Sequence, residues 1–222
     1  MMEVVSLPGL TPYARAHDLQ RELLEQRIRD EIPDTVIFLE HEPVITRGRG
    51  LQWSGEQRDR SVPLRTDLPA GVAYAEIERG GDLTYHGPGQ LVVYPIVKLG
   101  TSAKFPKADI MLYLRELERI GVDELKRLGL AQARGVENAS GIWVGDRKIA
   151  SLGIAVRKWV TYHGLAINLS TDLAAFNLID PCGYSPEVMT RLKDQDVSHE
   201  AQTRAHWERV FRTGLSSSIS VV

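Results

Sequence analysis

One residue of this 222-residue sequence is especially suited to covalent chemistry: its single cysteine, Cys182. A lone cysteine is most often a small buried hydrophobic residue. This one lies in the segment DPCGY at residues 180–184, and a loop flanked by proline and glycine suits an accessible thiol better. A thiol with the ordinary pKa of about 8.5 is mostly protonated at neutral pH. A nucleophilic cysteine therefore needs a nearby positive charge or base, which lysine or histidine can supply.

Lys148 is one residue that can activate such a thiol, because it follows a turn and begins an otherwise apolar strand. A solvated lysine at a strand end is the commoner alternative. Three histidines lie near glycine or proline: His41, His86 and His163. The other three lie in expected helices, where we interpret them as surface or packing residues: His17, His199 and His206. No HxxxH-type pair occurs, so we expect no metal site.

The segment RGGDLTYHGPGQ at residues 79–90 is the densest cluster of glycines. Glycine lets a backbone approach a ligand closely. The segment lies between two expected strands and lacks the GxxxxGK[ST] spacing of a phosphate loop, so it is no evidence for ATP binding. A plain connection between strands is the alternative, but Arg79, Thr84, Tyr85 and His86 favour a binding site.

The charge balance of 27 Lys+Arg against 29 Asp+Glu argues against a protein that binds nucleic acid phosphates. A single cysteine excludes an internal disulfide and a cysteine-rich metal cluster. Residues 1–10 do not read as a secretory signal, and no apolar run is long enough for a membrane span. We therefore expect a cytoplasmic protein that does not bind membranes.

The segment 47–65 is a long, arginine-containing loop in the sequence. Its arginines are Arg47, Arg49, Arg58, Arg60 and Arg65. A solvated loop of mixed charge is the simpler interpretation. The functional alternative is a docking patch for an acidic protein partner.

Apolar periodicity predicts helices at residues 12–30, 107–128 and 198–215. Strands are expected at residues 4–7, 35–40, 44–47, 72–78, 90–98, 141–144, 148–156 and 160–169. Pro95 in the segment 90–98 indicates a sheet edge or a bulge. The mixture predicts a single α+β or α/β domain over residues 1–222, with a mixed β-sheet flanked by helices.

Several motifs occur together in an order that resembles the lipoyl(octanoyl) transferases. They are HEPV at 41–44 with Thr46 and Gly48, RGGDLTYHGPGQ at 79–90, GIWV at 141–144, KIASLG at 148–153, HGLA at 163–166 with Asn168, and PCG at 181–183. Each motif alone is weak. The ordered set, with a lysine before SLG and a cysteine after HGLA, is specific.

This resemblance implies the fold of the biotin and lipoate ligase catalytic domains. It implies an acyltransferase that moves octanoyl (or lipoyl) from acyl carrier protein to a lysine of lipoyl domains. The implied acceptors are the lipoyl domains of 2-oxoacid dehydrogenase complexes and the glycine cleavage H protein. We expect a monomer without a cofactor.

The resemblance also implies the roles of individual residues. Cys182 is the nucleophile that carries the acyl thioester, and Lys148 lowers its pKa and transfers protons. His86 is a further donor or orienting group. The acyl group lies along Arg79, Gly80, Gly81, Asp82, Leu83, Thr84, Tyr85, His86, Ser151, Leu152, Gly153, Gly164, Leu165 and Ala166.

Three alternatives remain open from the sequence. An ATP-dependent lipoate or biotin ligase has the same fold, but does not need Cys182. A cysteine thioesterase releases free octanoate, because water is its acceptor. A non-enzymatic acyl-binding module binds the acyl group without turnover.

Overall fold

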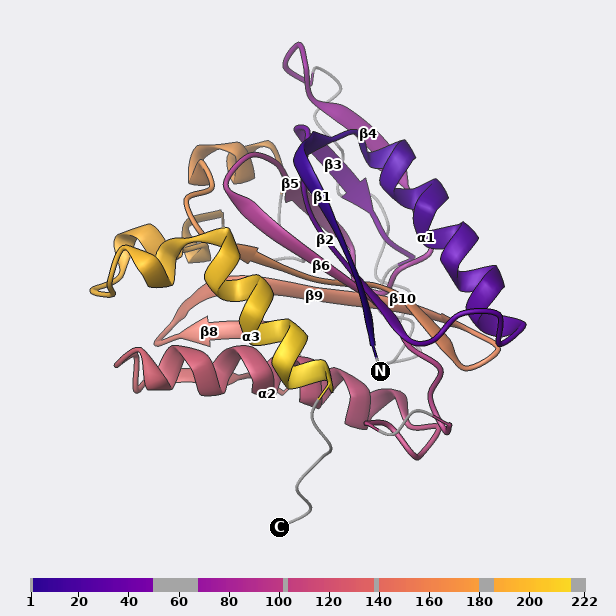
Figure 1. Ribbon diagram of the computed structural model, residues 1–222. Helices are drawn as coiled ribbons and strands as arrows, with labels where there is room; N and C mark the ends of the chain where they lie inside the picture. Colours follow the sequence, from indigo (N-terminus) through magenta and orange to yellow (C-terminus); the bar gives the residue numbers. More distant parts are fainter. Residues whose placement is uncertain (1, 50–67, 102–103, 138–139, 180–185, 217–222) are drawn as a thin grey trace.

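The computed structural model describes residues 2–49, 68–101, 104–137, 140–179 and 186–216 (Figure 1). Its main sheet has the strand order β1-β2-β6-β10-β9-β8-β7, and a smaller sheet has the order β4-β3-β5. The main-sheet strands are β1 (Glu3–Thr11), β2 (Thr35–His41), β6 (Gln90–Ile96), β7 (Ala133–Gly135), β8 (Gly141–Val144), β9 (Arg147–Arg157) and β10 (Val160–Asn168). The small-sheet strands are β3 (Val44–Arg47), β4 (Ala73–Glu76) and β5 (Leu83–His86).

Both sheets are mixed. Strands β1 and β2 run parallel, as do β3 and β4, whereas the other neighbours are antiparallel. Helices α1 (Tyr13–Ile28), α2 (Ile110–Arg127) and α3 (Arg204–Ser216) flank the main sheet (Figure 1). Short 3₁₀ turns occupy Leu173–Leu178, Pro186–Val188, Leu192–Asp194 and Glu200–Gln202. The predicted mixed sheet flanked by helices is confirmed.

Strand β2 is buried on both faces, which explains its continuous apolar sequence. Successive side chains of a strand point to opposite faces. Val36 and Phe38 accordingly pack in the cluster that contains residues of α2 and α3. Ile37 and Leu39 pack in a second cluster with Ala16 of α1. The main sheet is therefore a central layer, with α1 on one face and α2 and α3 on the other.

Pro95 does not mark a sheet edge, because β6 lies between β2 and β10. The edge interpretation is wrong, whereas a local irregularity is present. The Thr161 hydroxyl donates to the Pro95 carbonyl over 2.8 Å and accepts from the Val97 N–H over 3.1 Å. The hydroxyl thus satisfies backbone groups on either side of the donor that proline lacks. Gly164 of β10 leaves room for the proline ring, since a Cβ there would lie 2.8 Å from Pro95 Cδ.

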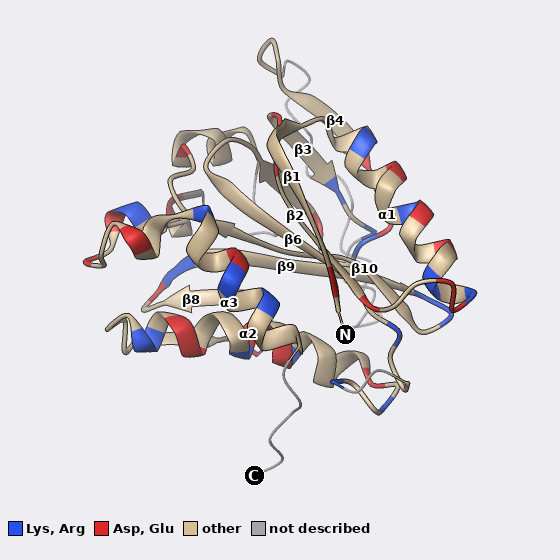
Figure 2. Ribbon diagram, viewed as in Figure 1, with Lys and Arg blue, Asp and Glu red and all other residues tan. Residues whose placement is uncertain are grey.

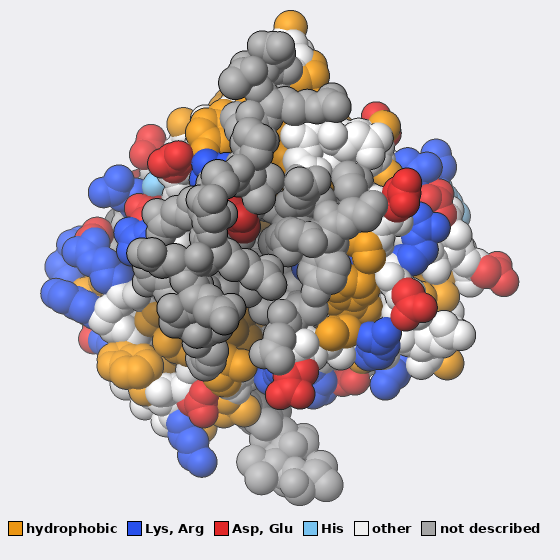
Figure 3. All heavy atoms as spheres, turned by 180° about the vertical axis from the view of Figure 1, so that it is seen from behind, with side chains coloured by type: hydrophobic (Ala, Val, Ile, Leu, Met, Phe, Trp, Pro, Cys, Tyr) orange, Lys and Arg blue, Asp and Glu red, His pale blue; other side chains and the backbone are white. Residues whose placement is uncertain are grey.

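Charged residues of both signs are distributed over the three α-helices (Figure 2), in keeping with the formal net charge of −2. Seen from behind, hydrophobic side chains are visible at the top, on the right side and at the lower left of the view, among charged ones (Figure 3). No helix in the described ranges is long and apolar enough to cross a lipid bilayer. Arg58, Arg60, Arg65 and Cys182 lie outside the described residues. The docking patch at residues 47–65 therefore stays a prediction.

Candidate functional site

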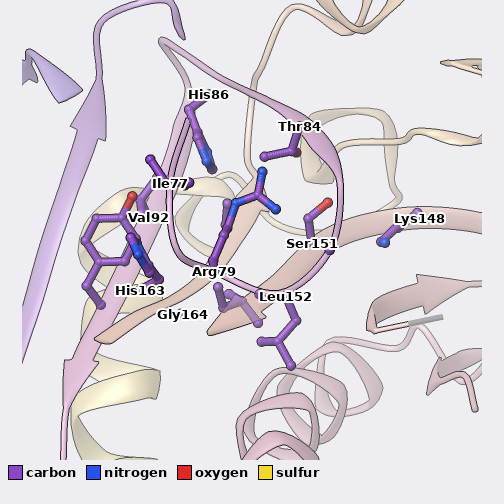
Figure 4. A pocket seen from close by; sticks show the side chains of 15 residues that line it. Ile77, Arg79, Thr84, His86, Val92, Lys148, Ser151, Leu152, His163 and Gly164 are labelled. Atoms are coloured by element: carbon purple, nitrogen blue, oxygen red, sulfur yellow. The ribbon is translucent and has the colours of Figure 1, made fainter. Parts of the chain in front are cut away.

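A cavity lies on the α1 side of the main sheet, against the small sheet. Its lining comes from β5, β6, β9, β10 and the segment that precedes β5 (Figure 4). The lining residues are Ile77, Arg79, Gly81, Thr84, His86, Val92, Tyr94, Lys148, Ser151, Leu152, Gly153, His163, Gly164, Leu165 and Ala166. The fold thus brings together segments that are far apart in the sequence.

Strand β5 contributes alternate residues to this cavity. Thr84 and His86 line it. Leu83 and Tyr85 pack instead in a cluster on the other face of the strand, where the Tyr85 ring contacts Phe176 edge-on. These two residues, like Gly80 and Asp82, are predicted acyl contacts that do not line the cavity. The period of two residues in a strand accounts for the division.

A β-bulge in β9 turns Lys148 toward the cavity. In the pairing of β8 with β9, Ile142 opposes Ala150 and the next residue, Trp143, opposes Lys148, so Ile149 is an extra residue. Lys148 and Ser151 are three positions apart and would face opposite sides of a regular strand. The bulge puts both in the cavity lining, while Ile149 and Ala150 both pack in the core.

The Lys148 side chain is held among apolar and backbone groups. It is 5 % exposed, and its Nζ lies 5.7 Å from the centroid of the Trp143 ring. Its carbonyl accepts a 2.9 Å hydrogen bond from the Thr190 N–H. Lys148 also forms an isolated parallel bridge with Met189. The strand position of Lys148 is therefore tied to the chain that follows residues 180–185.

Gly141 makes room for the lysine side chain. A Cβ at this position would lie 2.6 Å from Lys148 Cε and 2.3 Å from the Ala150 carbonyl oxygen. Gly141 has φ +140°, and its N–H donates to Glu118 Oε1 over 3.0 Å. The backbone conformation and the close approach both require glycine here.

The Gly141→Ala variant is expected to lose about 100-fold in turnover, because a misplacement of roughly 1 Å at a reacting group can cost that much. Steady-state rates of the expected acyl transfer, with the melting temperature recorded alongside, will measure it. Gly129→Ala is the matched control, because Gly129 has φ +96° and no atom within 4 Å of the position that a Cβ would occupy. Equal rates for the two variants would contradict a positioning role for Gly141.

Arg79 is fixed between the two sheets. It is 7 % exposed, and its Nη2 donates to the carbonyl and hydroxyl oxygens of Thr46, each over 2.8 Å. Gly153 permits this close approach, because a Cβ there would lie 2.7 Å from the Gly80 carbonyl and 3.2 Å from Arg79 Cδ. The Gly80 N–H donates to the Ile154 carbonyl over 2.8 Å. The guanidinium thus has a fixed place in the wall of the cavity.

Three buried histidines in and beside the cavity are kept neutral. Burial lowers the pKa of His41 to about 4. Burial, followed by the charges of His17 and Arg79, lowers the pKa of His163 to about 3. The pKa of His86 lies well below its usual range, mainly through burial and then through His41 and Arg79. These imidazoles therefore present lone pairs rather than positive charges at neutral pH.

The hydrogen bonds of Gln90 define the proton on His86. The Gln90 amide N–H group donates to the Tyr85 carbonyl and to Asn168 Oδ1, so its Oε1 must accept from His86 Nδ1, at 2.7 Å. Neutral His86 then carries its proton on Nδ1, and its Nε2 is an acceptor. With the proton on Nδ1, His86 is not a donor toward the acyl group, and the orienting role expected of His86 stays a prediction.

Acidification from pH 7 to pH 5 is expected to lower the melting temperature. Each of these histidines has an ordinary pKa of about 6.5 in the unfolded chain and a lower one in the fold. The unfolded state therefore binds more protons below pH 6.5, and stability falls as pH decreases from 6.5 toward 4. Scanning calorimetry across this window measures the loss, with His199→Gln, an exposed histidine, as control. A melting temperature that stays constant would contradict the lowered pKa values.

Three cavity residues were not identified from the sequence: Ile77, Val92 and Tyr94. Val92 and Tyr94 are two positions apart, which signals a common face of β6. The sequence does not say which face meets the cavity, because β6 is apolar on both.

The sequence matches the lipoyl protein ligase A/B catalytic domain over residues 12–209. The chain belongs to this family. The expected family is thereby confirmed. The matched residues include those that line the cavity, Lys148 among them, and the helices on both faces of the sheet.

Curated relatives of this family member are named octanoyltransferase. One from Syntrophobacter fumaroxidans is 42 % identical over 91 % of this chain and 88 % of its own length. One from Gloeobacter violaceus is 43 % identical over 82 % of this chain and 76 % of its own length. These relatives confirm the expected class, an acyltransferase.

Two solved structures share the fold. A putative lipoate protein ligase from T. acidophilum with bound lipoic acid has a TM-score of 0.68 at 21 % identity, covering 97 % of this chain and 86 % of that one. A lipoate-protein ligase A bound with ATP has a TM-score of 0.67 at 23 % identity, covering 98 % and 87 %. These likenesses confirm the expected ligase-type architecture.

Proposed function

We propose that this protein is an octanoyltransferase that moves an octanoyl group from a thioester donor to a lysine of a lipoyl domain through an acyl thioester on Cys182. The observation that carries the proposal is the placement of Lys148. It is buried in the wall of a cavity and bridged to Met189, seven positions after Cys182. The octanoyltransferase relatives support the reaction class.

The first half-reaction forms the acyl-enzyme. The Lys148 ammonium favours the Cys182 thiolate and so lowers the pKa of the thiol. The thiolate attacks the octanoyl carbonyl carbon, a new C–S bond forms, and the bond to the donor sulfur breaks. Lys148 gives its proton to the departing thiolate and becomes neutral.

The second half-reaction transfers the acyl group to nitrogen. The amine of the acceptor lysine attacks the thioester carbonyl, and neutral Lys148 accepts the proton that the amine loses. An amide bond forms and the Cys182 thiolate leaves, beside a re-protonated Lys148. A thioester becomes an amide without a nucleotide, which agrees with the missing phosphate-loop motif.

The cavity wall suits an alkyl chain beside this chemistry. Val92 and Ala166 provide apolar surface on the α1 side of the sheet. The glycines at positions 81, 153 and 164 let the chain lie against backbone. We restrict the proposed acyl contacts to the predicted residues that line the cavity.

The partners follow from the same proposal. We infer that acyl carrier protein is the donor, and that lipoyl domains of 2-oxoacid dehydrogenase complexes and the H protein are acceptors. Residues 1–222 act as a single monomeric domain in the cytoplasm, where a free thiol stays reduced. The arginines at 47–65 are the proposed contact for the acidic donor.

Intact mass spectrometry after incubation with octanoyl-acyl carrier protein and no ATP tests the proposal. One octanoyl group that is removed by hydroxylamine and maps to Cys182 is expected. Addition of a lipoyl domain then moves the group to the acceptor lysine. A requirement for ATP favours a ligase, and free octanoate as the product favours a thioesterase. Bound octanoate without an adduct favours an acyl-binding module.

A further inference from the structure

Two histidines and a glutamate from three separate elements meet at one end of the cavity. His17 belongs to α1, Glu78 precedes Arg79, and His163 belongs to β10. One ligand atom from each lies within 4.8 Å of the others. His163 and Lys148 stand on opposite sides of the cavity (Figure 4), and the acyl transfer uses neither His17 nor Glu78. The cluster is therefore a feature that the proposed reaction does not explain.

The distances in the cluster match the spacing of ligands around a small ion. Glu78 Oε2 lies 3.1 Å from His17 Nε2 and 3.7 Å from His163 Nε2. Ligands about 2.0–2.1 Å from a tetrahedral Zn²⁺ are about 3.3 Å apart. The two imidazole rings are stacked, with centroids 5.7 Å apart and planes inclined by 15°. The carboxylate oxygen thus lies within reach of both ring nitrogens.

His163 points to a ligand independently of these distances. The residue is 1 % exposed, and its Nε2 has no hydrogen-bond partner among the described residues. Its backbone is held at φ +57°, with the N–H donating to Gln20 Oε1 over 2.8 Å. A buried nitrogen without a partner is costly, and a neutral imidazole lone pair is a metal ligand. The fold directs the His163 side chain toward Glu78, and the Nε2 atom remains available to bind a metal ion.

We propose that His17, Glu78 and His163 bind one divalent transition-metal ion, with Zn²⁺ as the best fit and water as the fourth ligand. Two imidazole nitrogens and one carboxylate oxygen suit Zn²⁺, Co²⁺ or Ni²⁺ better than Mg²⁺ or Ca²⁺, which prefer oxygen ligands. The ion ties α1 to β10 and to the segment that leads into Arg79. Its role is to hold these elements together, and the proposed acyl transfer needs no Lewis acid. The nearby positive charge of Arg79 limits the affinity.

The absence of an HxxxH-type pair bears only on metal sites whose ligands lie within one element. Residues 17, 78 and 163 have no such spacing, because the fold alone makes them neighbours. The predicted absence of a metal site and this proposal are therefore alternatives that one binding experiment separates.

Calorimetric titration of the chelator-treated full chain with ZnCl₂ tests the site. The Cys182→Ser background is used, because a thiolate is itself a zinc ligand. We expect one ion per chain and a rise in melting temperature with Zn²⁺. His17→Gln and Glu78→Gln should each lower the affinity at least tenfold, whereas His199→Gln, at an exposed histidine, should not change it.

Titration with CoCl₂ gives a second readout, since visible absorption reports the coordination geometry. The apo variants are compared by melting temperature. Should one of them fail to fold, the other carries the test, because both side chains reach the surface. The proposal is overturned if the Cys182→Ser protein binds no stoichiometric Zn²⁺. Equal Zn²⁺ affinities of the His17→Gln, Glu78→Gln and His199→Gln variants would overturn it as well.

Discussion

Cys182→Ala is expected to abolish octanoyl transfer, with a loss of at least about 10³-fold in turnover. The alanine side chain cannot form the thioester, so neither half-reaction proceeds through the enzyme. Cys182→Ser should be nearly as defective, because a serine hydroxyl ionises far less readily than a thiol. Transfer from octanoyl-acyl carrier protein to a lipoyl domain, followed by mass spectrometry of the acceptor, measures both variants.

The melting temperatures of the two variants separate lost chemistry from lost folding. The alanine variant should fold normally and form no hydroxylamine-sensitive adduct. Full activity in this variant would end the thioester mechanism, while leaving direct transfer between donor and acceptor as the alternative.

Lys148→Ala should raise the pKa of the Cys182 thiol and slow transfer by about 10²- to 10⁴-fold. Loss of the ammonium removes both the charge that favours the thiolate and the group that transfers protons. Rates of alkylation by iodoacetamide as a function of pH report the thiol pKa directly. The Lys193→Ala variant, at an exposed lysine, is the control.

Lys148→Arg separates the two roles. An arginine keeps the positive charge that favours the Cys182 thiolate but does not lose its proton. The variant should still form the thioester, more slowly than the unmodified protein, because the donor sulfur can leave as a thiolate without a proton. It should then release the acyl group slowly to the acceptor amine, and acyl-enzyme should accumulate. An alkylation profile that is the same in wild type and Lys148→Ala would contradict the dyad.

Local sequence patterns predicted most of the elements correctly. The β-branched run at 35–40 forms β2, and the turn at Gly145 and Asp146 joins β8 to β9 as a hairpin. Both features depend on residues close together in the chain. The position of Pro95 was less predictable, because it depends on β10, where the Thr161 hydroxyl donates to the Pro95 carbonyl and Gly164 leaves room for the proline ring.

In the candidate site, too, features that depend on residues distant in the chain were not predictable from the sequence. Motif order led to Lys148 and to the segments around the cavity. It did not show that Leu83 and Tyr85 face the core while Thr84 and His86 face the cavity. The bulge at Ile149 depends on pairing with β8 and has no signature within β9 itself. Contacts between distant segments determine these orientations, and a single strand does not encode them.

The crossing of Gly80 over Gly153 has a consequence for the choice of substrate. Main chain lies against main chain there, joined by the bond from the Gly80 N–H to the Ile154 carbonyl. This part of the wall has no side chain that a substitution could shorten. In the proposed acyl transfer, a longer or shorter acyl group must therefore be accommodated by side chains elsewhere in the wall, such as Val92 and Ala166. The backbone crossing therefore fixes one part of the cavity wall. The part that substitutions can change is formed by side chains along the strands.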